Sequence, residues 1–542
     1  MEKLYCSCKE RNSLPLRPKY LVSEVCWGLH ACEASQIPYH THMESDNHPK
    51  KIQVFYDGQC PMCTVVMNKV DRSSKKEVFE LHDMHRENRL PFEKSAVEKE
   101  IHVVDQDETT YKGAEAILKI MDQYPSLRVL AKIGRLPFVK PLLPIGYKIV
   151  SQNRCFLFGP ASRIFWLRVA VTVAFTSGLI MSANLWLSSR SYPFAPVVDW
   201  LPIIAHPLDW ILFGAFLIFA AAVLISSKPS KFILGALTII FFLCLFDQTR
   251  WQPWVYQYSF LLITLALFSW KSDDVIGRTR ALNIARLIVA STYIFSGLQK
   301  INPEFFTGVF PWLVEPITTI LPSFAGSLYA FGIAAPFIQV VFGVGLLTRK
   351  FRRPSIVLAV LMHVFILAMI GPFGLNWNSI VWPWTAAMVI FDLLLFTGKE
   401  DFSFRDVLWS KNNLYHPVVL ILFGILPFFS FVNLWDSYLS SALYSGNVTG
   451  SVIHLNGVGR SDLPPQIQKY VTSVSANDNS LNIQSWAIGN LNVPPYPETR
   501  VYKALAKKVC SYMTDSSQVV VIIQEQRMFR NNSLTTYRCW NL

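Results

Sequence analysis

The sequence predicts a largely helical, polytopic membrane protein with a small α/β domain at each end. Only 16% of the 542 residues are charged, against about 25% in soluble domains. The deficit is concentrated between about residues 160 and 435, where long apolar stretches follow one another. Outside this region, strand-like and helix-like segments alternate. Basic loops on an anionic membrane surface explain the net charge of +13, so lipid is an expected partner and nucleic acid is not.

Composition divides the chain into four parts. Residues 1–49 are polar and lack periodicity, so we expect a disordered leader or a start assigned too early, with Met43 as the true first residue. Residues 50–158 form an N-terminal α/β domain and residues 160–435 a transmembrane domain. Residues 436–542 form a second α/β domain, with a strand over 517–529 and a helix over 498–513.

The central region contains about nine apolar segments that are candidates for membrane spans, which take roughly 20 residues each. Their expected limits are 163–187, 208–226, 231–247, 254–270, 281–299, 324–347, 355–371, 378–397 and 416–434. Because this number is odd, the two ends of the chain are expected on opposite sides of the membrane.

Basic residues are distributed unequally between the two sets of loops. Thirteen Lys and Arg residues fall in one set, and only Arg190, Arg250 and Lys300 fall in the other. Because basic loops stay in the cytoplasm, we expect a cytoplasmic N-terminal domain and an extracytoplasmic C-terminal domain.

Two features of the C-terminal region agree with an extracytoplasmic location. Asn447-Val448-Thr449 is a glycosylation sequon. Cys510 and Cys539 lie where a disulfide is able to persist.

The N-terminal domain has the segment order of an α/β sandwich. Strands are expected at 51–56, 78–84 and 101–106, helices at 63–72 and 114–124, and a turn at 107–113. This alternation over about a hundred residues predicts a thioredoxin-like sandwich. The basic, amphipathic segment 130–154 is expected to lie along the cytoplasmic membrane surface, with a solvated linker as the alternative.

Cys60 and Cys63 lie in the sequence Cys-Pro-Met-Cys, where the first strand gives way to a helix. A helix N-terminus stabilises a thiolate, and cysteines placed there have pKa values of roughly 3.5–7.5, against about 8.5 for a free thiol. We expect Cys60 to be the exposed, attacking thiolate and Cys63, more buried, to resolve the mixed disulfide. Asp57 either forms the turn with Gly58 or accepts a proton from Cys63.

Two other interpretations of the cysteine pair stay open. Zinc needs two further ligands, and His82 and His85 have a suitable spacing, although zinc-binding pairs usually lie on knuckle loops. The cysteines are alternatively two buried structural thiols. No metal is the expected outcome.

The segment FYDGQCPMC resembles the signature of the DCC family of thiol-disulfide oxidoreductases, through Asp57, Cys60 and Cys63. YKGAEAIL is similar to the family's Gly-x-x-Ala segment, through Gly113 and Ala116. The closing segment of the family is matched by Tyr147, Asn153 and Arg154. The resemblance covers about 50–158 and implies a thioredoxin-like fold with protein-disulfide reductase activity.

Within the membrane domain, RLIVASTYIFSGLQKINPEFF (286–306) is the most informative segment. Lys300 either extends to the lipid headgroups or, with His363, lines an outer pocket for an amphiphilic ring such as a quinone. The same pocket interpretation includes Asp247, Gln248, Arg250, Asn376, Asn378, Trp251, Trp254, Trp312, Trp377, Trp382 and Trp384. The tryptophans by themselves are typical of an interfacial aromatic belt.

The pattern Tyr293-x-x-x-Gly297-x-x-Lys300 resembles membrane helices of the vitamin K-dependent carboxylase-like (HTTM) and DoxX-like families. The resemblance implies that Lys300 is a base toward a quinone-type cofactor.

Three functional hypotheses follow. The first is a membrane-anchored thiol-disulfide oxidoreductase that reduces a protein or small-molecule disulfide without a bound cofactor. The second is a quinone-linked membrane enzyme or transporter, in which the cysteine pair serves as a redox sensor. The third is a non-catalytic scaffold with zinc-bound or buried cysteines.

Overall fold

The computed structural model forms two compact units that divide after Ser162. It describes residues 51–58, 60, 63–64, 66–67, 70, 78–87, 90–137, 139–152, 162–268, 274–397, 402–410, 413–475, 478–527 and 530–542. The predicted leader, and Asn153 and Arg154 of the family resemblance, lie outside these residues.

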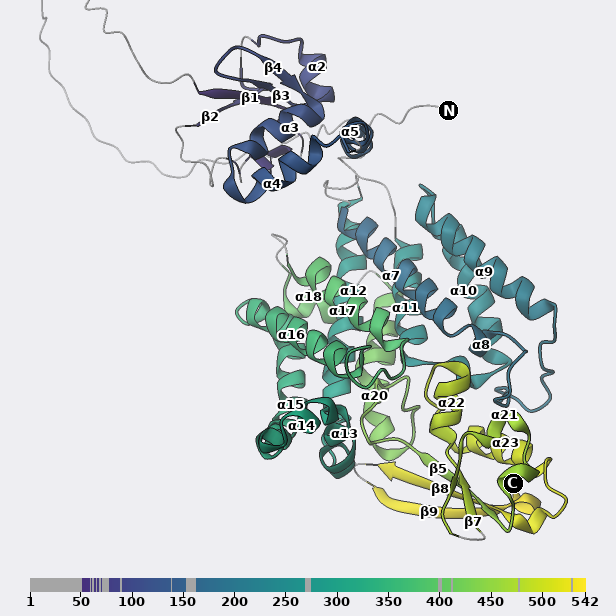
Figure 1. Ribbon diagram of the computed structural model, residues 1–542. Coiled ribbons are helices and arrows are strands. Elements are labelled where there is room, and N and C mark those ends of the chain that lie inside the picture. Colours follow the sequence, from purple (N-terminus) through teal and green to yellow (C-terminus); the bar gives the residue numbers. More distant parts are fainter. Residues whose placement is uncertain are drawn as a thin grey trace, which may run out of the picture. The chain divides into compact units, whose positions relative to one another are not determined.

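The first unit contains a four-stranded sheet with the order β2-β1-β3-β4 (Figure 1). β1 pairs in parallel with β2, whereas β3 pairs antiparallel with β1 and β4. Its elements are β1 (Ile52–Tyr56), β2 (Phe79–Asp83), α2 (Lys94–Lys99), β3 (His102–Val104), β4 (Thr110–Lys112), α3 (Gly113–Asp122), α4 (Pro125–Gly134) and α5 (Leu142–Gln152). The predicted small α/β domain is confirmed.

Side chains of β1 pack in two hydrophobic clusters, one on each face of the sheet, because successive residues of a strand face opposite sides. Ile52 and Val54 pack in one cluster with Ala116 of α3. Phe55 packs in the other with Val97 of α2. The sheet is therefore covered on both faces.

The predicted turn over 107–113 is wrong in its second half, where Thr110–Lys112 forms β4. The turn is tighter than expected: the Glu108 N–H donates to the Asp105 carbonyl, and Glu108 has a φ of 65°. The Thr-Thr-Tyr segment after the turn has strong strand propensity, and this propensity exceeds the turn preference of the residues on either side.

Gly113 and Tyr147 connect the sheet to α3 and α5. Gly113 has a φ of +55°, a conformation that favours glycine, and its N–H donates to the Ile101 carbonyl. The Ile101 N–H in turn donates to the Tyr147 hydroxyl at 3.0 Å. These two residues of the family resemblance therefore hold the start of β3 in place rather than contributing reactive groups.

The second unit begins with a helical body, here defined as residues 163–432. Its elements are α7 (Ser162–Met181), α8 (Ala183–Trp186), α9 (Leu208–Ile225), α10 (Ser230–Leu245), η1 (Gln248–Arg250), α11 (Pro253–Leu267), α12 (Val275–Leu298), η2 (Phe305–Val309), α13 (Phe310–Leu313), α14 (Glu315–Ile320), η3 (Pro322–Phe324), α15 (Ala325–Leu346), α16 (Arg352–Ile370), α17 (Val381–Phe396), α18 (Phe404–Leu408), α19 (Tyr415–Leu420), η4 (Ile421–Ile425), α20 (Leu426–Phe429) and η5 (Ser430–Val432).

Helices occur at all nine predicted apolar segments, but only six of the described helical segments are long and apolar enough to cross a membrane. The other three are α10, α11 and α17, with 16, 15 and 16 residues. At 1.5 Å per residue these helices are about 23–24 Å long, which is less than the roughly 30 Å hydrocarbon core. Membrane character is supported, and nine spans stays a prediction.

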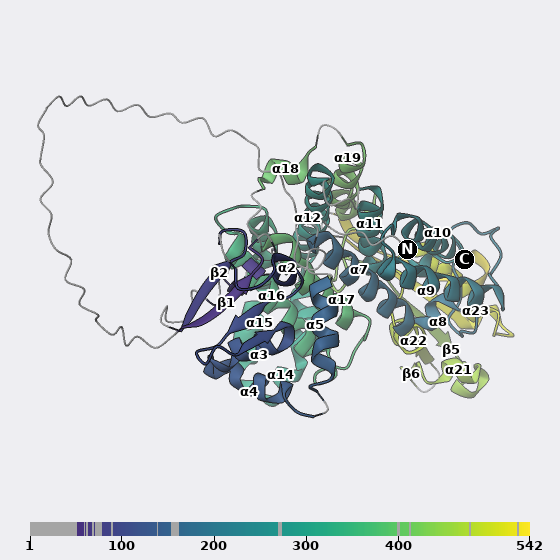
Figure 2. The same cartoon turned by 90° about the horizontal axis from the view of Figure 1, so that it is seen from above.

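α12 is the central helix of the body. It packs against α11, α15, α17, α18 and α19, and Figure 2 shows it beside α11 and α19. Gly297 permits a close approach of α15, because a Cβ there would lie 2.8–3.0 Å from Val340 and the Pro336 carbonyl. The glycine of the Tyr-Gly-Lys pattern is therefore explained by helix packing.

The chain ends in a five-stranded sheet with the order β6-β7-β5-β8-β9. Its elements are β5 (Gly450–Asn456), η6 (Arg460–Asp462), α21 (Pro465–Gln468), β6 (Val471–Ser473), β7 (Asp478–Leu481), α22 (Ile483–Leu491), α23 (Thr499–Cys510), η7 (Ser516–Gln518), β8 (Val519–Arg527), β9 (Arg530–Arg538) and η8 (Cys539–Asn541). The predicted strand and helix of this region are both present, and a disulfide joins Cys510 to Cys539.

The C-terminal sheet and the helical body share one hydrophobic cluster. The Tyr192 ring lies 5.1 Å from the Trp486 ring, and the Gln252 amide donates to the Pro494 carbonyl. At the other end of the body, the Arg163 side chain donates to the Thr397 carbonyl and Arg352 to the Phe402 carbonyl. The C-terminal sheet thus packs at one end of the helical body (Figure 1). At the opposite end, Arg163 and Arg352 bond to neighbouring loops.

The sequon at Asn447 is wrong as a glycosylation site in this fold. The Asn447 side chain is 2% exposed, and its amide donates to the Gln299 Oε1 atom at 2.6 Å. Glycan attachment requires an accessible asparagine. Asn447 instead fastens the C-terminal region to the end of α12.

Candidate redox site

The two cysteines lie where β1 ends and a helical segment begins. Cys63 and Thr64 are helical, and the Thr64 N–H donates to the Cys60 carbonyl. The Cys63 N–H points at the Cys60 sulfur, with 3.4 Å between nitrogen and Sγ. A backbone donor at a helix N-terminus favours the negative charge of a thiolate. The local geometry therefore supports Cys60 as the sulfur that ionises more readily.

The expected exposure of the two cysteines is reversed. Cys60 is 1% exposed, whereas Cys63 is half-buried, and neither is joined in a disulfide. The reason is that Cys60 follows the buried turn after β1, while Cys63 lies on the first turn of the helical segment. Attack by Cys60 on a bulky disulfide therefore requires local opening around its sulfur.

Asp57 lies beside the cysteines and is paired with a histidine. Its Oδ1 atom is 2.9 Å from His85 Nε2, and its side chain is largely buried. Its carbonyl also accepts the Cys60 N–H. Asp57 therefore forms the expected turn with its backbone, while its carboxylate contacts the His85 ring.

Asp83 holds this region together. Its Oδ1 atom accepts the Gly58 N–H at 3.1 Å and the His85 N–H at 3.0 Å. A Cβ on Gly58 would lie 2.1–2.4 Å from the Asp83 carboxyl group. Glycine at position 58 is therefore required for Asp83 to bridge the turn after β1 and the turn after β2.

The sequence reasoning missed this role of Asp83 and His85. The signal that predicts it is the parallel pairing of β1 with β2, whose register sets Tyr56 opposite Asp83. Residues that follow two neighbouring parallel strands meet at the same edge of the sheet. Asp57 and His85 are brought together in this way from positions 28 residues apart.

The zinc interpretation finds no support in the residues that the structure describes. No group of three or more His, Cys, Asp and Glu side chains suited to a metal occurs among them. His82 and His85 have different partners. His85 contacts Asp57, whereas His82 Nδ1 lies 3.0 Å from Glu87 and the His82 ring stacks on Phe55. The two histidines therefore have separate structural surroundings.

Lys300 and His363 are not joined by any bond within the described part of the chain. The Lys300 ammonium donates to the carbonyl and the hydroxyl of Ser296, one turn earlier on α12. His363 on α16 instead contacts Tyr293, whose hydroxyl is 2.8 Å from its Nε2. Quinone binding by Lys300 and His363 stays a prediction.

Of the other polar residues of the predicted outer pocket, Asp247, Arg250 and Asn378 are buried, whereas Asn376 is exposed. Asp247 is buried between Arg190, at 2.5 Å, and Arg250, at 3.8 Å. The tryptophans are distributed among several contacts: for example, the Trp384 indole donates to Gln257 and the Trp382 indole to the Ile370 carbonyl.

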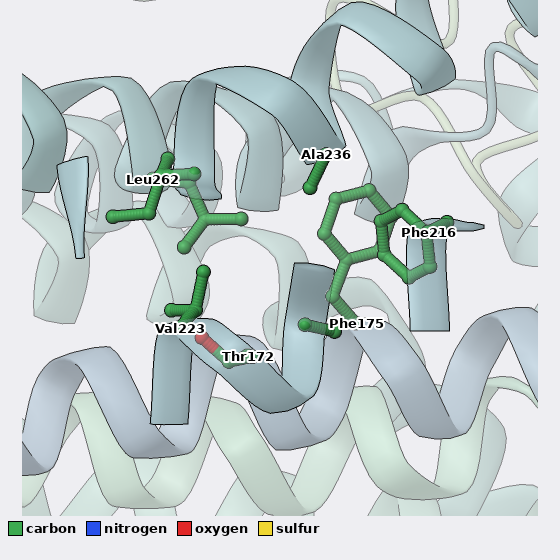
Figure 3. Close-up of a pocket in the computed structure, with 8 residues that line it drawn as sticks. Thr172, Phe175, Phe216, Val223, Ala236 and Leu262 are labelled. Carbon is green, nitrogen blue, oxygen red and sulfur yellow. The ribbon is translucent and has the colours of Figure 1, made fainter. Parts of the chain in front are cut away.

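Neither of two cavities in the helical body contains these residues. One cavity of about 10 Å³ is lined by Thr172, Phe175 and Phe216 among others, which suffices for about one water molecule (Figure 3). The second is a depression of about 320 Å³ between α12, α18 and α19, lined by polar residues that include Arg280, Asn283 and His416.

Comparison with known proteins supports the redox interpretation of the first unit. No curated protein and no solved structure gives a significant match to this chain. The resemblance of the helical body to carboxylase-like and DoxX-like families has no support from these comparisons. Residues 54–160, which contain Asp57, Cys60, Cys63, Asp83 and His85, match the family model of the DCC1-like thiol-disulfide oxidoreductases.

Proposed function

We propose that this protein is a membrane-anchored thiol-disulfide oxidoreductase in which Cys60 and Cys63 supply the reducing electrons. The observation that carries the proposal is the Cys63 N–H directed at the Cys60 sulfur, at 3.4 Å, at the start of a helical segment. This arrangement favours the thiolate, which is the reactive form of cysteine.

The strand order supports a thioredoxin-like fold for this domain. A parallel β1–β2 pair is extended on the β1 side by the antiparallel strands β3 and β4. The cysteine pair follows β1, which is a central strand of this sheet. A rigid sheet edge is a suitable support for two sulfurs that must meet at bonding distance.

The reaction proceeds in two exchange steps. The Cys60 thiolate attacks a substrate disulfide, forms a mixed disulfide and releases the first substrate thiolate. The Cys63 thiolate then attacks the Cys60 sulfur, which releases the second substrate thiolate and leaves a Cys60–Cys63 disulfide. Two electrons pass to the substrate, and an external dithiol restores the pair.

Asp57 and His85 are the proposed acid-base pair for these steps. The Asp57 carboxylate accepts a hydrogen bond from His85 Nε2, and in the proposed mechanism it takes the proton of Cys63 as that thiol becomes a nucleophile. His85 positions the carboxylate and does not itself touch the substrate. Such proton transfer by a placed side chain contributes roughly 100-fold or more to a rate.

The proposed location is a cytoplasmic N-terminal domain and an extracytoplasmic C-terminal sheet. The bias of basic loops supports it, and two of the three exceptions, Arg190 and Arg250, are buried. The Cys510–Cys539 disulfide also fits an oxidising compartment. In a reducing cytosol the pair at Cys60 runs in the direction of disulfide reduction.

Helices α4 and α5 support contact of the N-terminal domain with lipid. Their exposed side chains include Val129, Leu130, Ile133, Leu142 and Ile145. Basic residues such as Lys132 and Lys148 lie on the same two helices. Apolar side chains beside basic ones are typical of helices that lie in an anionic membrane interface.

The experiment that tests the function measures disulfide reduction by the full chain in lipid nanodiscs, with insulin as substrate and dithiothreitol as donor. Cys60→Ser and Cys63→Ser should each abolish turnover above the uncatalysed rate. Cys244→Ala is the matched control, because Cys244 is a buried free thiol on α10, far along the chain. Full activity in both Cys60→Ser and Cys63→Ser would overturn the proposal.

A further inference from the structure

Three ionisable side chains from three different helices meet inside the helical body. The Tyr293 hydroxyl of α12 lies 2.7 Å from Asp392 Oδ2 of α17 and 2.8 Å from His363 Nε2 of α16. Tyr293, His363 and Asp392 are 2%, 7% and 0% exposed. Nothing in the proposed redox chemistry uses them.

The surroundings of this site are unfavourable to charge. The Phe342 ring packs edge-on against Tyr293 at 5.1 Å, and α16 and α17 are apolar along most of their length. In the described part of the chain, no Lys or Arg side chain forms an ion pair with Asp392. Ionisable groups inside membrane helices are costly and are usually retained for a function.

The charged residues nearest along α12 are two helical turns away on either side and are bound elsewhere. The Arg286 guanidinium donates to the Leu395 carbonyl and Asn283. Lys300 donates to Ser296. Of the helices packed against α12, α11 brings Tyr256 and Tyr258, α15 brings Tyr329, α18 brings Arg405 and Asp406, and α19 brings Tyr415 and His416.

None of the neighbouring titratable groups is bonded to Tyr293, His363 or Asp392 among the described residues. The Tyr415 hydroxyl donates to the Phe260 carbonyl, and His416 Nε2 contacts the Val407 carbonyl. The three side chains therefore form a separate unit, whose charge depends only on the protons that it holds.

A second buried aspartate in the same helical body provides a contrast. Asp247 pairs with Arg190 at 2.5 Å and also accepts bonds from Thr249 and the Ala195 N–H. Its charge is neutralised by fixed partners, as expected for a structural role. Asp392 has a phenol in place of a cation, so its charge is neutralised only by a proton.

The phenol is able to act as donor to one partner and acceptor from the other. When His363 is doubly protonated and Asp392 is ionised, Nε2–H donates to the phenol oxygen and the phenol donates to Oδ2. A concerted shift moves the Nε2 proton to the phenol and the phenol's own proton to Asp392. Imidazole, phenol and carboxylic acid are then all neutral, and no proton or electron is gained or lost.

The two outer atoms of this chain of groups are also buried. Asp392 Oδ1 and His363 Nδ1 have no hydrogen-bond partner among the described residues. Buried polar atoms in purely structural networks are nearly always satisfied. The two atoms are the ends of this hydrogen-bonded chain, where a proton would be gained or released.

We propose that Tyr293, His363 and Asp392 form a proton-transfer site within the helical body, with the Tyr293 phenol as the bridge between carboxylate and imidazole. The ligand of this site is a proton. The site is independent of the cysteine chemistry, so either proposal stands if the other fails.

Infrared difference spectroscopy of the full chain in nanodiscs tests the site, with pH as the variable. The carboxylic-acid band that is absent in Asp392→Asn reports Asp392, and the imidazole bands that are absent in His363→Gln report His363. In the wild-type protein each protonation step should change both signals at the same pH, because the two groups share protons through the bridge. In Tyr293→Phe, which removes only the bridging hydroxyl, the carboxylic-acid and imidazole signals should change at different pH values.

Tyr258→Phe is the matched control, because Tyr258 is a buried tyrosine whose hydroxyl has no partner among the described residues. It should behave as the wild type. Independent midpoints in the wild type, or a Tyr293→Phe spectrum like that of the control, would overturn the proposal. If Tyr293→Phe does not fold, the His363→Gln variant provides the test. The pH at which the Asp392 carboxylic-acid band changes should differ from the wild type, and an unchanged value would contradict the proposal.

Discussion

The Nε2 atom of His85 lies 2.9 Å from the Oδ1 atom of Asp57, directly after the two parallel strands that carry them. This pair gives the cysteine site a carboxylate that is held in place from a neighbouring turn. A thiol-disulfide exchange centre needs such a group when the second thiol must lose its proton.

Asp57→Asn should lower the rate of disulfide reduction by roughly 100-fold, the lower end for general acid-base groups. His85→Gln should cause a smaller loss, because the carboxylate stays in its turn but loses the imidazole that holds it in place. Steady-state insulin reduction measures both effects.

The matched control for His85 is His82→Gln, since His82 contacts Glu87 rather than Asp57. It should leave the rate of disulfide reduction unchanged. Equal rates for His85→Gln and His82→Gln would show that the Asp57–His85 contact has no part in catalysis.

Gly58→Ala should destabilise the N-terminal domain by roughly 1–3 kcal/mol. The added methyl group occupies the place of the Asp83 carboxyl group, which then loses its bonds to the Gly58 and His85 N–H groups. Urea denaturation of the 1–162 unit measures the change in the free energy of unfolding.

Gly146→Ala is the control in the same domain, because a Cβ there meets nothing within 4 Å and the residue lies within α5. It should be neutral or stabilise by up to about 1 kcal/mol. A Gly58→Ala domain as stable as the Gly146→Ala domain would contradict the proposed tight contact.

The stability of the N-terminal domain should fall as the pH drops below about 6.5. Burial lowers the pKa of His102 from its ordinary value of 6.5, so the unfolded chain binds a proton that the folded domain excludes. The stabilisation is complete above 6.5 and is lost as the pH falls through the folded pKa. Urea denaturation at several pH values measures the slope.

His102→Phe identifies the source of that slope. Phenylalanine retains a ring against Phe92, whose centroid is 4.6 Å from that of His102, but has no titratable nitrogen. The variant should show a shallower dependence on pH than the wild type. Identical slopes would assign the effect to another group.

The Cys510–Cys539 disulfide predicts both stability and sidedness. Its 29-residue separation corresponds to roughly 3–4 kcal/mol of stabilisation in the chain-entropy account, which thermal unfolding of the double Ser variant measures. In sealed, right-side-out vesicles, a membrane-impermeant reductant should open this disulfide, and a membrane-impermeant maleimide should then label both cysteines. If the two cysteines are labelled only after the vesicles are permeabilised, the C-terminal sheet lies on the cytoplasmic side of the membrane.

Much of the fold follows from local sequence, because strands such as Ile52–Tyr56 and helices such as Thr499–Cys510 carry their own periodicity. Contacts between distant residues do not. The burial of Cys60 and of Asn447 depends on which segments pack over them. The Tyr293–His363–Asp392 cluster needs the arrangement of three helices, although each residue is visible in the sequence as an ionisable group in an apolar segment.

The most direct measurement of the central claim is mixed-disulfide trapping on the full-length Cys63→Ser protein in nanodiscs. Incubation with glutathione disulfide and peptide mass spectrometry should find one glutathione on Cys60, formed faster than on free cysteine at neutral pH and lost in the Cys60→Ser, Cys63→Ser double variant. A Cys60 sulfur that remains unmodified, while Cys63 of the Cys60→Ser variant is also inert, would contradict the account.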